Sequence, residues 1–316
     1  MNKLVFFGNE RLATGVNTTA PTLQALISAG YQIQAVVVAQ ESGENSSKSR
    51  KSRPLEIVNV AKYHNIPVLV PQKLSDIIDQ LASYKADAGI LAAFGKLVPQ
   101  SVIDIFPRGI INIHPSLLPA HRGSIPIEAA LLSGDPETGV SLMQLVRTMD
   151  GGPVYAQSTV PLMGTETKQA LADRLLQLGT TMLIASLPAI LDGSLVAQPQ
   201  PDVAVVYDQR LSKDAGRLNQ ADWNRPAKDI ERMVRAFAGW PRVRTNLAGT
   251  EVILTAAHIL SDDLADEGSP GKLWVSSRKL GVHTRDSILV VDRLIPANKK
   301  EMTANDFLSG RHLLDF

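Results

Sequence analysis

The sequence predicts an α/β protein in which a mostly parallel sheet is followed by a smaller β-barrel domain. Over the first 190 residues, apolar runs of strand length alternate with helical stretches, and short β-type runs follow a proline-containing stretch. A chain of 316 residues also exceeds what one core usually holds. We therefore expect a first domain over residues 1–191, a linker over residues 192–206 and a second domain over residues 207–316.

The first domain is expected to be Rossmann-like, with helices crossing between parallel strands. We predict strands at residues 4–7, 33–39, 68–70, 88–92, 109–113 and 140–146. We predict helices at residues 21–29, 55–64, 75–84 and 167–191. Pro21 opens the first helix and Gly30 lies just past its end, while apolar residues three and four apart mark the core face of the last helix.

The second domain is expected to be a small OB-like barrel built from five short strands and one helix. Pro199 and Pro201 mark the linker before it. The helix is predicted at residues 226–237, and β-type runs lie at residues 251–256, 272–275, 280–284 and 287–294. Barrels of this kind often hold nucleic acid.

Composition fits a cytoplasmic globular protein. Charged residues make up 20% and apolar residues 44%, and we find no apolar run that approaches the roughly 20 residues of a membrane span. The N-terminus lacks a secretory pattern, and the absence of cysteine excludes disulfides and cysteine-based metal sites. A net charge of only +1 excludes a uniformly basic nucleic-acid binder, so any RNA contact must come from local patches.

Asn112, His114 and Asp150 are the candidate catalytic residues. Asn112 and His114 are two apart at the end of an apolar run, so on a strand their side chains leave the same face. Asp150 follows the run at residues 140–146, and a strand neighbouring the first would deliver its carboxylate to the same edge, where open α/β sheets place their sites. The alternative is a strand with one buried asparagine and one satisfied histidine.

These three residue types suit acyl or formyl transfer to an amine. An amide N–H can hold a developing oxyanion, and donors of this kind contribute about 3 kcal/mol in other acyl-transfer enzymes. A histidine with an ordinary pKa of about 6.5 can carry the proton that the amine loses, and a carboxylate can orient the ring or hold a relaying water.

The residues around this trio carry a family resemblance. Residues 112–119 read Asn-Ile-His-Pro-Ser-Leu-Leu-Pro, followed by Arg122-Gly123 and Pro126-Ile127. This resembles the signature of the folate-dependent formyltransferases, which carry their catalytic aspartate where Asp150-Gly-Gly-Pro falls. The Arg-Gly-x-x-Pro-Ile run and several later stretches, such as Arg235-Ala-Phe-Ala-Gly-Trp-Pro241, are more similar to the methionyl-tRNA formyltransferase branch, over nearly the whole chain.

The resemblance implies a substrate pair and a set of binding residues. The formyl donor would be 10-formyltetrahydrofolate, and the acceptor would be the α-amino group of methionine on initiator tRNA. Folate-binding residues would come from two runs: Ser116, Leu117, Leu118 and Pro119, and Leu91, Phe94, Gly95 and Leu97. Taken alone, the second run also fits plain core.

A serine-rich basic insert over residues 40–54 is longer than most βα loops. In this family the matching loop enters the acceptor end of the tRNA, so the resemblance favours RNA contact by four cations: Lys48, Arg50, Lys51 and Arg53. A solvated surface loop is the alternative.

Several other site classes find no support in the sequence. Gly8 and Gly15 do not supply a dinucleotide fingerprint, and they also depart from the family's usual loop. No histidine or carboxylate spacing indicates a metal, and no serine elbow is present. Alternatives to the main hypothesis are an amino-sugar formyltransferase, a hydrolase releasing formate from the same folate, and a silent tRNA-binding module. We expect a monomer.

Overall fold

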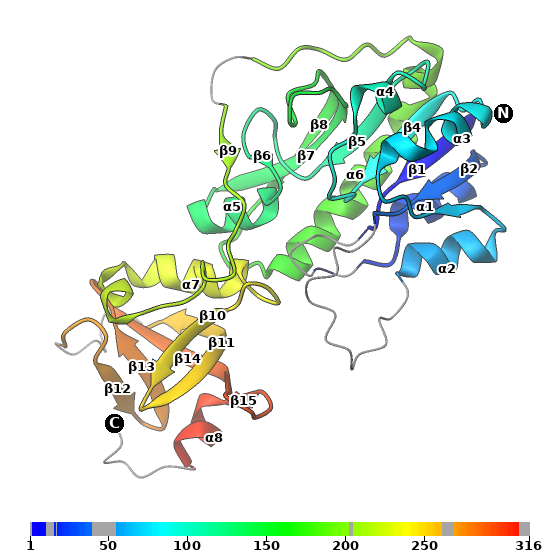
Figure 1. Cartoon of the computed structure of the whole chain (residues 1–316). Coiled ribbons are helices and arrows are strands. Elements are labelled where there is room, and N and C mark those ends of the chain that lie inside the picture. Colours follow the sequence, from blue (N-terminus) through cyan, green and yellow to red (C-terminus); the bar gives the residue numbers. More distant parts are fainter. Residues whose placement is uncertain are drawn as a thin grey trace. The chain divides into compact units, whose positions relative to one another are not determined.

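A computed structural model describes residues 2–10, 16, 18–39, 55–201, 205–260 and 268–309. The chain forms two compact units (Figure 1). The first unit contains Met1–Pro126, Pro136–Leu162 and Gln169–Arg210, and the second contains Ile127–Asp135, Met163–Lys168 and Leu211–Phe316.

The first unit contains a seven-stranded sheet in the order β3-β2-β1-β4-β5-β7-β8. Strands β1 to β5 are parallel, whereas β7 and β8 run antiparallel, which confirms the predicted mostly parallel sheet. The strands are β1 (Lys3–Phe7), β2 (Gln32–Val37), β3 (Val68–Leu69), β4 (Ala88–Ala92), β5 (Ile110–His114), β7 (Glu137–Gln144) and β8 (Val154–Pro161). A short parallel pair is formed by β6 (Arg122–Gly123) and β9 (Tyr207–Asp208).

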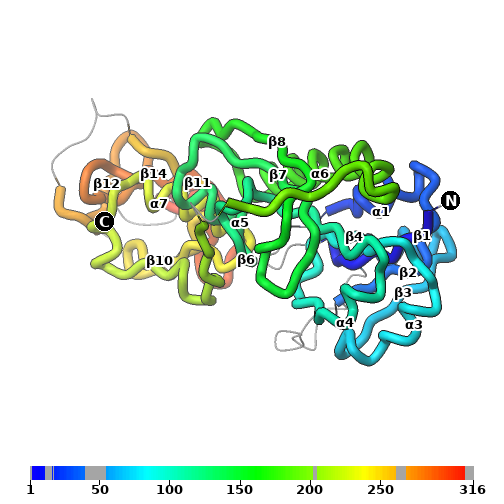
Figure 2. The backbone as a smooth tube through the Cα atoms, turned by 90° about the horizontal axis from the view of Figure 1, so that it is seen from above, coloured from blue at the N-terminus to red at the C-terminus, as the bar shows by residue number. Residues whose placement is uncertain are grey.

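Helices cover both faces of this sheet, as Figure 2 shows. The helical elements of the first unit are α1 (Pro21–Ser28), α2 (Glu56–Tyr63), η1 (Leu74–Ile77), α3 (Ile78–Ser83), α4 (Gln100–Ile103) and α6 (Lys168–Asp192), whereas α5 (Pro126–Ser133) belongs to the second unit from Ile127 onward. Leu81 of α3 and Val102 of α4 pack into one core cluster with Ile110. On the opposite face, a Cβ added to Gly179 of α6 would lie 2.4 Å from Ile113, so this helix lies unusually close to the sheet.

Helix α6 also meets the length and composition of a membrane span, with a mean hydropathy of 1.4 over its most apolar window. It is the one helix of this kind among the described residues. Charged residues interrupt its sequence, and its buried leucines form a stripe at helical spacing: Leu171, Leu175, Leu183 and Leu187. The core helix of a globular protein has this same pattern.

The second unit is built on an antiparallel sheet in the order β10-β11-β14-β13-β12. Strand β14 pairs along one edge with β11 and along the other first with β13 and then with β15. The strands of the second unit are β10 (Val243–Leu247), β11 (Thr250–Ile259), β12 (Leu273–Ser276), β13 (Lys279–His283), β14 (Ile288–Pro296) and β15 (Met302–Thr303). Its helical elements from the C-terminal part of the chain are η2 (Gln220–Asn224), α7 (Ala227–Ala236) and α8 (Ala304–Ser309). The antiparallel pairing agrees with the predicted small β domain, while its OB-like closure stays a prediction.

Two segments from the first half of the chain belong to the second unit, and contacts with α7 and its flank hold them there. Arg232 donates a hydrogen bond to the carbonyl of Ser133 at 3.2 Å, and Arg235 donates to the carbonyl of Glu166 at 3.0 Å. Lys168 Nζ lies 3.6 Å from Glu128 Oε1 and donates to the carbonyl of Trp240 at 3.0 Å. The second unit therefore includes segments that precede their partners on α7 by 69 to 99 residues in the sequence.

Candidate active site

Strand β5 carries Asn112 and His114 on one face of the sheet. All five residues of the strand are buried, because β4 and β7 flank it on both sides. Asn112 and His114 alternate with Ile111 and Ile113, so they face away from α6, toward the side on which Ile110 joins the core. The structure confirms that both side chains leave the same face of one strand.

Asp150 reaches this face by a different path from the one predicted. Strand β7 runs antiparallel to β5, with His114 opposite Ser141 and Ile111 opposite Gln144. The end of β7 therefore lies at the wrong edge of the sheet, and the prediction that a neighbouring strand would deliver the carboxylate directly was wrong. Residues 145–150 instead fold back toward His114 as an irregular loop, which starts with a hydrogen bond from the N–H of Leu145 to the carbonyl of Ile110 at 2.8 Å.

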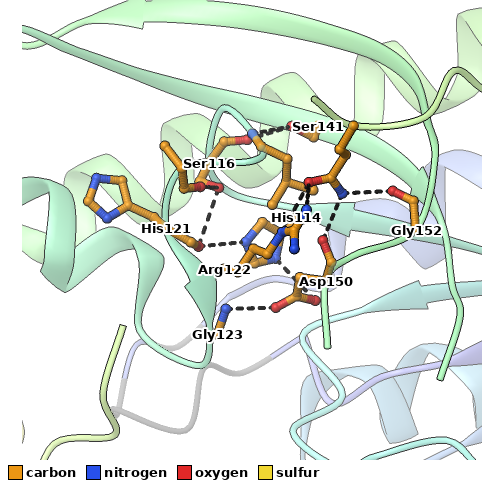
Figure 3. Close-up of polar contacts among 11 residues, drawn as sticks. His114, Ser116, His121, Arg122, Gly123, Ser141, Asp150 and Gly152 are labelled. Atoms are coloured by element: carbon orange, nitrogen blue, oxygen red, sulfur yellow. Dashed lines mark hydrogen bonds and ion pairs between the residues drawn. The ribbon is translucent and has the colours of Figure 1, made fainter. Parts of the chain in front are cut away.

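His114 lies between a carbonyl and a carboxylate (Figure 3). Its Nε2 is 3.0 Å from the carbonyl oxygen of His121, and its Nδ1 is 3.8 Å from Asp150 Oδ1. Because a carbonyl oxygen only accepts hydrogen bonds, this contact assigns a proton to Nε2. Nδ1 is then the nitrogen that can gain or lose a proton, and it faces the carboxylate across a gap too long for a direct hydrogen bond.

Asp150 is fixed through its other carboxylate oxygen and through its backbone. Oδ2 accepts a hydrogen bond from the backbone N–H of Gly123 at 2.8 Å. The residue has a φ of +47°, a left-handed conformation that Asp adopts more readily than most residues. One oxygen is thus anchored while the other faces His114.

The predicted folate run at residues 116–119 forms a hydrogen-bonded turn beside this trio. The hydroxyl of Ser141 donates to the carbonyl of Ser116 at 2.7 Å and accepts from the N–H of Leu118 at 3.1 Å. Ser116 and Leu118 are buried, whereas Leu117 and Pro119 are half-buried. Only the latter two therefore present much apolar surface to a ligand.

The second predicted folate run divides in the same way. Leu91 and Phe94 belong to the buried core, and the ring of Phe94 meets that of Phe7 edge-on at 5.9 Å. Gly95 is exposed with a φ of +75°, and Leu97 is 74% exposed. The loop after β4 thus offers Leu97 next to the edge where β5 ends, because β4 and β5 are parallel neighbours.

Some predicted features cannot be placed. Lys48, Arg50, Lys51 and Arg53 lie outside the described residues, as does Gly15. Gly8 is described, and a Cβ there would lie 2.2 Å from the carbonyl oxygen of Ala92, so close approach of the two strand ends explains this glycine. Across the part of the chain that the structure describes, no group of three or more His, Cys, Asp or Glu side chains could hold a metal.

The structure adds polar residues that sequence reasoning missed. Arg122 is 8% exposed, and its guanidinium donates to Gln200 and to the hydroxyl of Tyr207. His121 Nδ1 lies 3.1 Å from the carboxylate of Asp208. Arg122 stood in the signature motif, but nothing in the sequence marked Gln200, because it falls in the stretch that composition assigns to a linker.

Comparison with known proteins matches both halves of the chain. Residues 3–187 match the family model described as formyl transferase, and residues 210–312 match the formyl transferase C-terminal domain. A protein from Roseiflexus castenholzii and one from Halorhodospira halophila, both named methionyl-tRNA formyltransferase, are each 34% identical to this chain. The matches cover 98% and 99% of this chain and 96% and 97% of those proteins, respectively.

A solved structure shares the fold. It is WlaRD, a sugar 3N-formyl transferase described in the presence of dTDP and 5-N-formyl-THF. It aligns with a TM-score of 0.66 and 17% identity, covering 95% of this chain and 99% of WlaRD. Together with the two matched domains and the full-length relatives, the arrangement of Asn112, His114 and Asp150 leads to one conclusion: this chain belongs to the formyl transferase family.

Proposed function

We propose that the chain transfers the formyl group of 10-formyltetrahydrofolate to the α-amino group of methionine esterified to initiator tRNA. The observation that carries this proposal is that His114 and Asp150 face each other, with Asn112 on the same face of β5, in a family member whose full-length relatives bear the name methionyl-tRNA formyltransferase. The reaction supports the start of protein synthesis, and we expect it in the cytoplasm.

The residues beside the trio suit a folate. Leu117, Pro119 and Leu97 each leave apolar surface accessible, while backbone groups of the non-helical turns can hydrogen-bond the polar edge of a pterin. When bound, the folate supplies the formyl group on its N10 atom. We assign its binding to these three residues, with Ser116, Leu118, Leu91, Phe94 and Gly95 shaping the loops that carry them.

Each member of the trio has one task in the proposed reaction. The attacking amine must be neutral, and an ordinary α-amino group titrates at about 7.7–8.0, so a useful fraction is neutral near pH 7.5. Asn112 donates its amide N–H to the formyl oxygen as negative charge develops there. His114 takes up the amine proton at Nδ1 and returns it to the nitrogen that leaves the formyl carbon.

Asp150 supports proton transfer without contacting His114 directly. The 3.8 Å between Asp150 Oδ1 and His114 Nδ1 leaves room for the proton to pass along a bridging water, and the carboxylate favours the protonated ring once it forms. The fixed hydrogen bond from Nε2 to the carbonyl of His121 keeps the ring oriented during this exchange.

The acceptor end of the tRNA needs a surface of its own. We assign contact with it to Lys48, Arg50, Lys51 and Arg53 together with the C-terminal part of the chain, residues 207–316. Four cations within six positions can displace several counterions from RNA phosphates, which predicts strongly salt-dependent binding. Catalysis is assigned to residues 1–191, in a protein that we expect to be monomeric.

The test is a transfer assay with labelled 10-formyltetrahydrofolate. Methionyl-initiator tRNA, methionyl-elongator tRNA and an amino-sugar nucleotide are offered separately, and the formylated product is quantified. Rapid transfer to the initiator species alone would support the proposal. Transfer to the sugar alone, or release of free formate without any acceptor, would replace it with the corresponding alternative, and folate binding without transfer would indicate a silent binding module.

A further inference from the structure

Gln200 uses its entire side-chain amide to connect three residues of the candidate site. Its Nε2 donates to the carbonyl of Asp150 and to the carbonyl of Gly152, each at 2.7 Å. Its Oε1 accepts from Nε of Arg122 at 3.1 Å and from Nη2 of the same guanidinium at 2.7 Å. An amide has two donors and two acceptor positions, so all four are occupied.

The chemistry of these partners requires an amide at this position. On one side, two carbonyl oxygens only accept hydrogen bonds, and on the other side the guanidinium of Arg122 only donates them. A carboxylate could serve Arg122 but would repel the two carbonyls, and an apolar side chain would serve neither side. Glutamine is the matched side chain for both neighbours.

The backbone around Gln200 is held in place independently of the Gln200 side chain. Pro199 and Pro201 flank it, and a residue before proline is confined to extended conformations. Gln198 exchanges two backbone hydrogen bonds with Val154 at the start of β8, at 2.7 and 2.8 Å. The stretch predicted as part of a linker is therefore fastened to the first unit at this point.

The loop that carries Asp150 depends on such anchors because it has no regular structure over residues 145–153. The side chain of Asp150 does not hydrogen-bond His114 directly, so its position depends on the loop backbone together with the hydrogen bond from Gly123. The carbonyls of Asp150 and Gly152 flank the turn that aims the carboxylate, and both end on the Gln200 amide.

We propose that Gln200 is a positioning residue, which holds the 150–152 turn so that the Asp150 carboxylate faces His114 Nδ1. This rests on the proposed function, since it assigns Gln200 an effect on the rate only through Asp150. Misplacement of a catalytic group by about 1 Å can cost about 100-fold in rate. Loss of the amide is thus expected to lower kcat by about 10- to 100-fold with little change in KM for either substrate.

Three variants separate this role from general structural support. Gln200→Leu removes all four hydrogen bonds, and Gln200→Glu keeps an acceptor for Arg122 while removing both donors to the loop. Gln198→Leu is the matched control, because the Gln198 side chain is exposed and bonds only Val196 by a long 3.3 Å contact among the interactions of the described residues. We expect both Gln200 variants to lose kcat, and the control to retain wild-type kcat and Tm.

A double-mutant cycle with Asp150→Asn tests directly whether Gln200 acts through Asp150. Asparagine tolerates the left-handed conformation and still accepts from Gly123, so this variant removes charge while keeping the loop. If Gln200 acts through Asp150, adding Gln200→Leu to Asp150→Asn lowers kcat by less than about threefold further. Each enzyme is compared at equal folded fraction, checked by thermal unfolding.

The outcomes assign failure to one hypothesis or the other. A wild-type rate for Asp150→Asn would remove Asp150 from the proposed mechanism. A strong loss in Asp150→Asn with full activity in Gln200→Leu or Gln200→Glu, or with fully multiplicative effects in the double variant, would leave the proposed function standing and overturn the role of Gln200.

Discussion

The two units hold ionisable groups in contrasting ways. In the first unit, His114 and Asp150 are each tied to backbone, to the carbonyl of His121 and the N–H of Gly123, and they face each other without a direct hydrogen bond. In the second unit, Glu128 and Lys168 are each 2% exposed and face each other at 3.6 Å. Because His114 and Asp150 are held by the backbone, they can still exchange protons with a substrate. Glu128 and Lys168 pair with each other, and this pairing serves the structure of the unit.

Burial has a measurable consequence for the second arrangement. It lowers the pKa of Lys168, because the loss of solvation outweighs the opposing attraction of Glu128. A buried ion pair of this kind rarely stabilises a protein more than well-packed apolar side chains would, yet removing one partner leaves the other charge buried and unpaired. We therefore expect the second unit to tolerate loss of the whole pair better than loss of half of it.

The largest expected effect comes from breaking the first arrangement at His114. His114→Ala removes the group that carries the amine proton, so kcat should fall by about 100- to 10,000-fold while tRNA binding changes little. Formyl transfer and tRNA affinity are measured on the same preparation. His64→Ala is the matched control, since His64 is exposed just past the end of α2, where its ring meets that of Tyr63, and it is not among the residues assigned to folate or tRNA. A near-normal rate for His114→Ala would contradict the mechanism.

Breaking the second arrangement should cost stability. Lys168→Met leaves Glu128 buried without its cation, and such a loss typically costs about 3–5 kcal/mol of unfolding free energy. The double variant Glu128→Met with Lys168→Met should recover most of that loss, as measured by denaturant unfolding. Additive losses in the double variant would show that the two side chains contribute independently, and would contradict this expectation.

Glu10 is a buried carboxyl that contacts the backbone and has no cation partner among the described residues. It is 1% exposed, and Oε1 accepts from the N–H of Leu23 at 3.1 Å. Burial raises its pKa from 4.5 to about 7. Between these values the unfolded chain releases the proton while the folded chain keeps it, so stability falls as the pH rises through this window and levels off above it.

The pH dependence gives the corresponding test. From pH 5 to pH 8, wild type should lose about 2 to 3 kcal/mol of unfolding free energy relative to Glu10→Gln, which cannot ionise. Urea unfolding at both pH values measures this difference. Parallel pH profiles for the two proteins would show that folding does not shift the pKa of Glu10, and would contradict this expectation.

The smallest expected effect lies at the edge of the second unit. Arg232 donates to the carbonyl of Ser133 near the end of α5 and is partly exposed. Arg232→Ala should lower the unfolding free energy by only about 0.5–1.5 kcal/mol, the net value of one hydrogen bond. Denaturant unfolding of Arg232→Ala and Lys168→Met, measured side by side, compares the loss of unfolding free energy at this partly exposed residue with that at the buried pair. Equal losses would mean that burial does not set the size of the effect.

Periodic patterns predicted most elements well, since they depend on residues near one another in sequence. The predicted strand at residues 88–92 coincides with β4, and the predicted helix at residues 226–237 contains α7. Strands β8 and β10 were not predicted. The residues of β8 are mostly half-buried or exposed, so the strand carries little apolar signal, and β10 mixes arginine and asparagine with its apolar residues.

Sequence alone determined which groups can do the chemistry: the spacing of Asn112 and His114 on one strand, and the motif that adds Asp150 to them. Tertiary structure alone decided how they meet. The antiparallel direction of β7 sends Asp150 back along a loop, and Gln200 reaches that loop from 50 residues away in sequence. Local patterns encode periodicity and turns, but strand direction and long-range hydrogen bonds depend on which distant segments pack together, and no local pattern records that.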